Sequence, residues 1–154
     1  MKKALFFLAV LSILITGCSG GQKQEVEKFI QDAFRARAEA VFTYKDKKPL
    51  SQHYSAKALQ QGRDYLDWSP NGQWSNVKNI KYSTRIRFEK LDIDNKMATA
   101  VVYETVVVTW DYIDPSQVMG TAFVKEDAWS NKKHVLTLNM TPEGKWLIDE
   151  DIMD

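Results

Sequence analysis

The chain has 154 residues, of which 44% are hydrophobic and 12% aromatic, enough to form one folded domain with its own core. Its 21 Lys and Arg residues nearly balance its 20 Asp and Glu residues, and no long basic run appears. Proteins whose main partner is nucleic acid usually concentrate positive charge to neutralise phosphates. The composition therefore excludes nucleic acid as the main partner.

Residues 1–17 have the pattern of an N-terminal signal peptide. Lys2 and Lys3 precede an apolar run over residues 4–15, and small residues come after it. A membrane-spanning helix needs about 20 apolar residues, so this run is too short to be a permanent anchor. We predict that residues 1–17 are a leader that is removed.

The segment Ile15-Thr16-Gly17-Cys18 resembles the lipobox of bacterial lipoproteins, in which an aliphatic and two small residues precede the cysteine that becomes the new N-terminus. The resemblance implies a diacylglycerol on the Cys18 thiol, often with a further acyl chain such as palmitate on the amine. Two or three acyl chains give durable attachment to a membrane. The implied location is the extracytoplasmic face of the cell membrane.

The alternative is an ordinary secretory signal peptide with a chance cysteine. Against it, Cys18 is the only cysteine and occupies the one position that the lipobox requires. If Cys18 carries lipid, no thiol remains for a disulfide, for thiolate catalysis or for metal binding.

A flexible tether is predicted over residues 18–23, which contain two glycines, and a single domain over residues 24–154. The helical period of apolar residues from Val26 to Phe42 predicts a long helix from about Gln24 to Tyr44. A polar segment with Pro49 then interrupts the pattern.

Ser55 is a candidate N-cap for a second, shorter helix that extends toward Trp68. The turn-forming residues 69–72 separate this helical half of the chain from the remaining half.

The second half of the chain has the two-residue period of strands. Residues 80–89 alternate between apolar and polar side chains, residues 92–96 predict a turn, and residues 97–112 are rich in Val, Thr and Tyr. Residues 113–131 keep no steady period and predict a long connection, which leaves room for a short edge strand at 120–125.

A second hairpin closes the chain. Residues 133–140 alternate, residues 141–144 predict a turn, and residues 145–151 form a final strand. The whole order predicts an α+β fold, with a long and a short helix packed on a curved antiparallel sheet of three to four strands.

The closing pattern Leu136-Thr137-Leu138 followed by Gly144-Lys145-Trp146-Leu147-Ile148, together with the element order, resembles the nuclear transport factor 2-like, or cystatin-like, superfamily. More narrowly, the chain is similar to accessory domains ahead of proposed amidase domains in secreted proteins of Gram-positive bacteria. The resemblance implies a cone formed by the helices and the sheet. That fold serves both small isomerases or dehydratases and non-enzymatic binding domains, so it does not decide the function.

Glu104 is the candidate catalytic acid or base. It lies in register with Val102 and Val106 on an apolar strand face, where desolvation would raise the pKa of its carboxyl group. Tyr103 or Tyr112 would assist it. The alternative is a bulge in this long strand, which would turn Glu104 to the other face.

No metal or cofactor is predicted. His53 and His134 are not placed beside another likely ligand or base, and the common metalloprotease, serine hydrolase and nucleotide-binding motifs do not occur. The acidic residues at 149–151, with Asp154, could attract a divalent cation, but we expect them to form a solvated terminus.

Aromatic residues near predicted strand ends are candidates for ligand binding: Trp74, Trp110, Tyr112 and Trp129. Such a rim would suit a protein, a peptide or a glycan. The alternative is that these rings close the wide end of the cone.

We therefore predict a membrane-anchored, non-catalytic binding or accessory domain in the cell envelope, with an isomerase or dehydratase that uses Glu104 as the alternative. A third hypothesis, an immunity or stress lipoprotein that sequesters a toxic peptide, differs from the first only in its ligand.

Overall fold

The computed structural model describes residues 18–44, 48–60, 77–114, 116 and 126–154. Their helical elements are α1 (Cys18–Glu39), a π-helical turn (Ala40–Tyr44), a 3-10 turn (Lys48–Gln52) and α2 (Ala56–Gln60). The strands are β1 (Val77–Asp94), β2 (Met97–Tyr112), β3 (Glu126–Met140) and β4 (Trp146–Met153).

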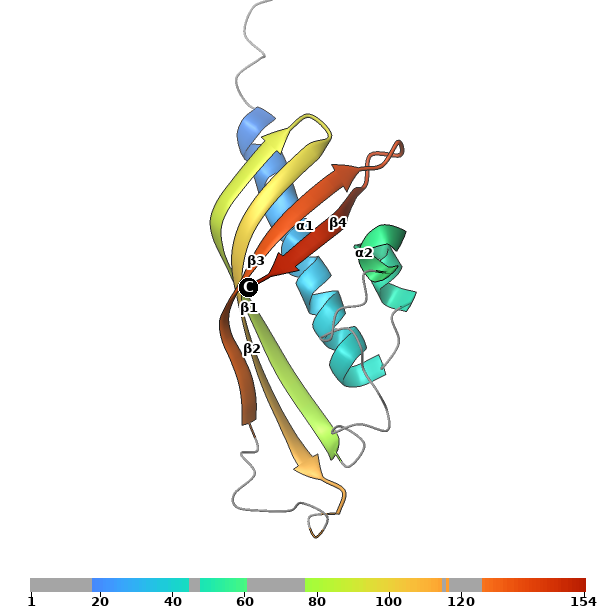
Figure 1. Ribbon diagram of the computed structural model, residues 1–154, viewed down its shortest axis with the longest axis vertical. Helices are drawn as coiled ribbons and strands as arrows, with labels where there is room; N and C mark the ends of the chain where they lie inside the picture. Colours follow the sequence, from blue (N-terminus) through green and yellow to red (C-terminus); the bar gives the residue numbers. More distant parts are fainter. Residues whose placement is uncertain (1–17, 45–47, 61–76, 115, 117–125) are drawn as a thin grey trace, which may run out of the picture.

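The four strands form one antiparallel sheet in the order β1-β2-β3-β4, so each strand pairs with the next along the chain. Figure 1 shows that the sheet is strongly bent and twisted, and that α1 runs along one of its faces. Among the described residues, no helix covers the opposite face. The predicted α+β class, with a long helix on a curved antiparallel sheet, is confirmed.

The regular alternation of β2 explains how the sheet forms an apolar inner face. Val102, Glu104, Val106 and Val108 are buried against α1, as the two-residue period predicts. The bulges lie on the partner strands: β1 carries an extra residue opposite β2 at two places, and β3 carries one. The predicted register of β2 is therefore confirmed, and the bulge weighed as the alternative is found on its neighbours.

The predicted helix end at Tyr44 is confirmed, but α1 begins at Cys18. The residues expected as a tether are therefore helical. Gly20 and Gly21 each cost a helix about 1 kcal/mol relative to alanine, which disfavours this turn without preventing it. Ser55 caps α2 as predicted, because its Oγ accepts a hydrogen bond from the Ala58 amide at 3.2 Å.

The structure extends β3 well before the predicted start at Lys133, since β3 begins at Glu126. The bulge opposite Thr105 interrupts the two-residue period of β3, and Asn131 adopts a left-handed backbone there with φ 56°. The unsteady period that predicted a connection therefore comes from a bulged strand. The predicted edge strand at 120–125, the turn at 69–72 and the far end of the second helix lie outside the described residues.

The turn before β4 is confirmed. Gly144 has φ 81°, a conformation that glycine adopts without steric cost, and it lies between β3 and β4. The strand edge beyond β4 is partly covered, because Ser55 donates its amide to the Ile148 carbonyl at 2.9 Å and Ile148 donates to the His53 carbonyl at 2.8 Å.

Two apolar clusters join α1 to the inner face of the sheet. The larger includes Val26, Ile30 and Phe34 of α1 with Leu136 and Ile148 of the sheet. The smaller lies toward the other end of β2 and consists of Ala38, Phe42, Val106, Val108 and Trp110, with partly buried neighbours. Apolar burial of this kind supplies most of the stability of a domain of this size.

The register of β2 predicts opposite outcomes for two adjacent valines. Val106 is 0% exposed and Val107 is 37% exposed. We expect Val106→Ala to lower the free energy of unfolding by roughly 2 kcal/mol, and Val107→Ala by about 0.5 kcal/mol, since both lose a β-branched side chain but only Val106 loses burial. Urea unfolding measures both. Equal losses would contradict the register.

Candidate functional site

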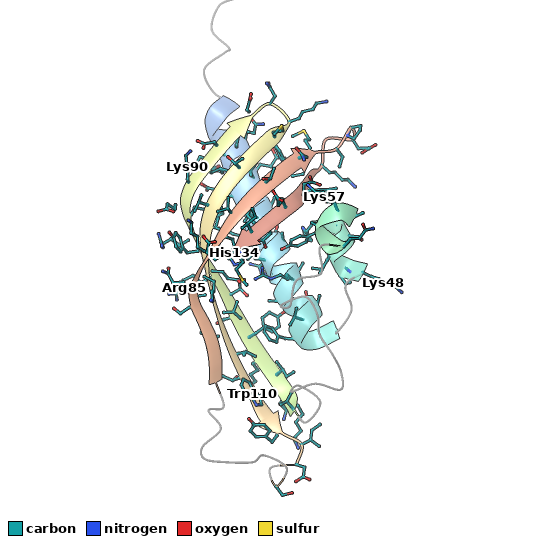
Figure 2. All side chains as sticks on the ribbon, viewed as in Figure 1. Lys48, Lys57, Arg85, Lys90, Trp110 and His134 are labelled. Carbon is teal, nitrogen blue, oxygen red and sulfur yellow. The ribbon has the colours of Figure 1, made fainter. Side chains whose placement is uncertain are left out.

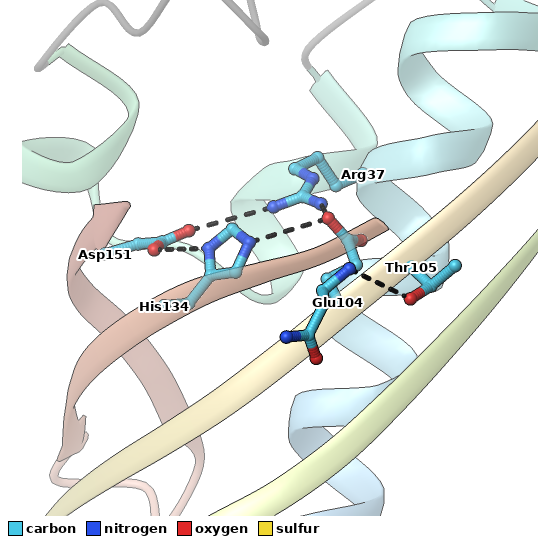
Figure 3. A network of polar contacts seen from close by, with 6 residues as sticks. Arg37, Glu104, Thr105, His134 and Asp151 are labelled. Atoms are coloured by element: carbon cyan, nitrogen blue, oxygen red, sulfur yellow. Dashed lines mark hydrogen bonds and ion pairs between the residues drawn. The ribbon is translucent and has the colours of Figure 1, made fainter. Parts of the chain in front are cut away.

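Four buried ionisable side chains meet between α1 and the inner face of the sheet, and each comes from a different element. They are Arg37 of α1, Glu104 of β2, His134 of β3 and Asp151 of β4 (Figure 3). Their exposed fractions are 2%, 0%, 0% and 3%. We call them the buried charge cluster.

The helical and strand periods place three of these residues. Arg37 follows Ile30 by seven positions and Ala33 by four, so it lies on the buried stripe of α1. Glu104 continues the inward row of β2. His134 shares the inner face with Leu136, as expected from the alternation of β3.

A bulge in β4 places the fourth residue. Ile148 pairs with Leu138 and Glu150 pairs with Thr137, so Asp149 is an extra residue without a partner across the ladder. The bulge shifts the alternation by one residue, which turns Asp151 inward in place of Glu150. A strand without the bulge would have left Asp151 on the outer face.

The acidic end of the chain is therefore not simply a solvated terminus, and that prediction is wrong for Asp151. Asp151 is buried. Asp149 accepts hydrogen bonds from the Ser55 hydroxyl at 2.7 Å and from Lys57 at 3.3 Å. The bond from Ser55 contributes most to lowering the pKa of the Asp149 carboxyl group. Within the described residues, no group of three or more side chains is arranged to hold a metal ion.

The contacts within the buried charge cluster form a continuous network (Figure 3). Arg37 Nη2 donates to Glu104 Oε2, and Arg37 Nη1 lies 3.8 Å from Asp151 Oδ2. His134 places Nδ1 2.9 Å from Asp151 Oδ1 and Nε2 3.6 Å from Glu104 Oε2. Each carboxylate thus faces both the guanidinium and the imidazole.

The ring of Phe34 covers the network on the helix side. Arg37 Cζ lies 4.5 Å from the ring centroid, and His134 meets the ring edge to face at 4.9 Å between centroids. Both contacts are favourable for a cation or an imidazole against an aromatic ring, and they help to keep water out.

The charge balance of the cluster depends on His134. Burial by itself lowers the pKa of His134, but the hydrogen bonds to Asp151 and Glu104 and the attraction of Asp151 outweigh it, so the pKa is raised above its usual 6.5. With His134 protonated, two positive groups face two carboxylates and the cluster is neutral. This is the arrangement in which buried charges cost least.

The structure changes two predictions about this region. Glu104 lies on the apolar inner face as predicted, but Arg37 binds it, so it is not an isolated carboxylate in an apolar pocket. The prediction that His134 has no suitable partner is wrong, because Asp151 and Glu104 both face it. His53, in contrast, lies near α1 with its ring 5.6 Å from that of Phe29.

The predicted aromatic rim is only partly within the described residues. Trp110 is 7% exposed and packs in the smaller apolar cluster, with its ring at 6.4 Å from that of the half-buried Tyr112. Figure 2 shows Trp110 toward the end of β2, apart from His134. Both rings therefore belong to the smaller apolar cluster and its margin. Trp129 pairs with Val106 through the backbone of β3, and Trp74 lies outside the described residues.

A groove of about 480 Å³ lies elsewhere, between α1 and β1. Its lining consists of Gln31, Arg35 and residues 82–86, and it does not include Glu104.

No helix in the described part of the chain is long and apolar enough to cross a membrane.

No known sequence family matches the chain, and no curated protein matches it in sequence. Solved structures share its fold. The intermembrane-space region of chloroplast protein ARC6 superposes with a TM-score of 0.59 at 10% identity, covering 84% of this chain and 94% of that chain.

Two bacterial structures are similar to a lesser degree. A conserved protein from Planctomyces limnophilus gives a TM-score of 0.52 at 16% identity, over 85% of this chain and 99% of its own. A candidate aromatic ring hydroxylase from Novosphingobium aromaticivorans gives a TM-score of 0.51 at 17% identity, over 85% of this chain and 89% of its own. At such identities these neighbours show the fold alone, so the resemblance to the nuclear transport factor 2-like superfamily stays a prediction. The narrower similarity to accessory domains ahead of amidases stays a prediction.

The raised pKa of His134 predicts a pH dependence with a definite sign. Because the folded pKa lies above the unfolded value of 6.5, the stabilisation from protonated His134 is fully present below about pH 6.5. It is lost as pH rises through the folded pKa. We expect the loss of unfolding free energy in His134→Gln to be larger at about pH 6 than at about pH 9, as measured by urea unfolding.

His53→Gln is the control of opposite sign. Burial lowers the pKa of His53 despite the attraction of Asp32, so His53 resists protonation and destabilises the fold as pH falls below 6.5. An NMR titration that places the imidazole pKa of His134 below 6.5 would contradict the assignment.

Proposed function

We propose that the protein is a membrane-anchored lipoprotein whose domain is a non-catalytic binding or accessory module in the cell envelope. The anchor is lipid on Cys18, which the lipobox pattern supports. Since α1 begins at Cys18, an anchored chain would hold the domain close to the membrane surface.

The observation that carries the non-catalytic role is the burial of the charge cluster. Its four side chains are 0–4% exposed, and they form ion pairs with one another across α1 and the sheet. A general acid or base must come within about 3 Å of a substrate proton. Glu104 instead contacts Arg37 and His134, and it is not among the residues that line the groove beside β1.

The outer face of the sheet supports a binding role, because no described helix covers it. Arg87 stacks on the ring of Tyr103 with Cζ at 4.2 Å from the centroid, and the Tyr103 hydroxyl donates to Glu89 at 3.2 Å. Val107 is exposed on the same face. Aromatic and arginine side chains are enriched at protein-binding surfaces.

The ARC6 region adds one point of agreement. It is by name an intermembrane-space domain, so the fold suits a setting between or beside membranes. At 10% identity this says nothing of the ligand.

Replacement of Cys18 tests the anchor. We expect Cys18→Ser to move the protein from the membrane fraction to the soluble fraction of the producing cells, because an unlipidated chain lacks its acyl chains. The free energy of unfolding should be unchanged. Ser19→Ala is the matched control and should stay at the membrane. Retention of Cys18→Ser in the membrane fraction would contradict the lipoprotein assignment.

Site-specific cross-linking in the same cells tests the binding role. A photoreactive residue at Val107, on the outer face, is expected to yield a discrete cross-linked envelope component, and one at Lys145, in the turn before β4, is the control. Identical products from both positions, or none from Val107, would count against binding through this face.

The isomerase or dehydratase alternative needs a substrate path to Glu104. It would gain support only if Glu104→Gln abolished an enzymatic turnover of the protein while leaving its unfolding transition unchanged. In the described residues, the burial of Glu104 and its ion pair with Arg37 favour the binding role.

A further inference from the structure

The groove between α1 and β1 runs along an edge of the sheet. Five consecutive residues of β1, from Tyr82 to Ile86, line it. Successive side chains of a strand point to opposite faces, so a cavity lined by all five must lie beside the strand rather than over one face. Among the described residues β1 pairs only with β2, and the groove therefore follows the edge of β1 that faces away from β2. We call this free edge of the strand, as far as the described residues show it, the β1 edge.

The β1 edge is regular over the length of the groove. The bulges of β1 lie between Lys78 and Lys81 and between Phe88 and Lys90, and the register with β2 is unbroken between them. The unbroken interval from Lys81 to Phe88 is longer than a typical strand of about five to six residues. Bulges usually blunt an exposed edge, and here they leave its middle intact.

The two sides of the β1 edge differ in polarity. Toward α1, the partly buried Tyr82 and Ile86 present apolar surface, while the outer side carries the exposed cations Lys81, Arg85 and Arg87. The lining itself contains two arginines and no carboxylate. A strand added here would meet cations with one row of side chains and apolar groups with the other.

Arg35 adds positive charge from the helix side of the groove. Its side chain is 70% exposed, and it pairs with Asp32 at 3.4 Å, a carboxylate that Lys28 binds more closely at 2.6 Å. The Thr84 Oγ1 atom is buried in the groove lining and finds no hydrogen-bond partner among the described residues.

We propose that this groove binds an extended peptide segment with alternating acidic and apolar residues, which adds a fifth strand at the β1 edge. Main-chain hydrogen bonds to the edge supply affinity, and the cations on the outer side select the acidic row. The inference rests on the binding role proposed above and names the surface and the class of ligand.

The test uses the full chain, purified in detergent, and a fluorescent peptide of about eight alternating Glu and Val residues. We expect saturable binding that weakens with added salt, as measured by fluorescence anisotropy. A peptide of alternating Lys and Val should not bind. The Glu and Val peptide with N-methylated alternate amides should also fail, because it keeps the charge but cannot pair with a strand.

Charge reversal in the groove locates the site. Arg35→Glu combined with Arg85→Glu should weaken the binding of the Glu and Val peptide by about tenfold or more, which corresponds to about 1.4 kcal/mol. Lys96→Glu combined with Lys145→Glu, two exposed lysines in turns away from the groove, is the matched control and should leave affinity unchanged. Equal unfolding midpoints of both variants show that the fold is retained.

Three results would overturn the inference: no saturable binding, equal binding of the N-methylated peptide, or equal affinity of the groove variant and the wild type. Self-association of the chain that the groove variant abolishes would also overturn it, since the occupant would then be a second copy. If cross-linking from Val107 succeeds while the peptide fails to bind, the binding role stands and the edge proposal falls.

Discussion

The ion pair between Arg37 and Glu104 is the interaction on which the arrangement of helix and sheet depends. A guanidinium and a carboxylate without water each cost several kcal/mol unless they meet a partner with good geometry. Arg37 comes from α1 and Glu104 from the second strand, so the pair fixes the rotation and the height of α1 over the sheet. A shifted register of the helix would separate these two charges and take the guanidinium away from Glu104.

The same constraint extends to the last two strands. Arg37 brings one positive charge to two buried carboxylates, and His134 brings the second when it is protonated. The bulge at Asp149 is what turns Asp151 toward His134. One side chain from each of α1, β2, β3 and β4 is thus required for neutrality, which couples four elements that are distant in sequence.

The buried charge cluster leaves recognition to the outer face and the edges of the sheet, because its four side chains already pair with one another beneath α1. The edge of β4 is partly occupied by the segment around His53, whereas the β1 edge borders a groove. The outer side of β1 is basic, and no described helix covers that face. Both features favour binding at this side of the sheet.

The sequence predicted the features that depend on local periodicity. The inward position of Glu104 followed from the regular alternation of β2, and the Ser55 cap followed from its residue type. Arg37 lies on the buried stripe of α1, but its role was not predicted. The sequence does not show which carboxylate would pair with a lone cation in an apolar row. The inward position of Asp151 could not be predicted either, for a different reason.

Strand bulges are the feature that sequence periodicity missed. An extra residue at Asp149 reverses the faces of all residues after it, and no local pattern marks that position. The bulge before Lys132 likewise hid the first part of β3. Partnership within the buried charge cluster arises from tertiary contacts between distant segments, which a single sequence does not display.

A double-mutant cycle on Arg37 and Glu104 tests the central claim that their pairing holds the helix on the sheet. Arg37→Met leaves two carboxylates with one histidine and should cost about 3–5 kcal/mol of unfolding free energy, whereas Arg37→Met combined with Glu104→Met leaves the neutral pair of His134 and Asp151. We predict that the double variant loses at least about 2 kcal/mol less than the sum of the two single losses. Additive losses would contradict the claim.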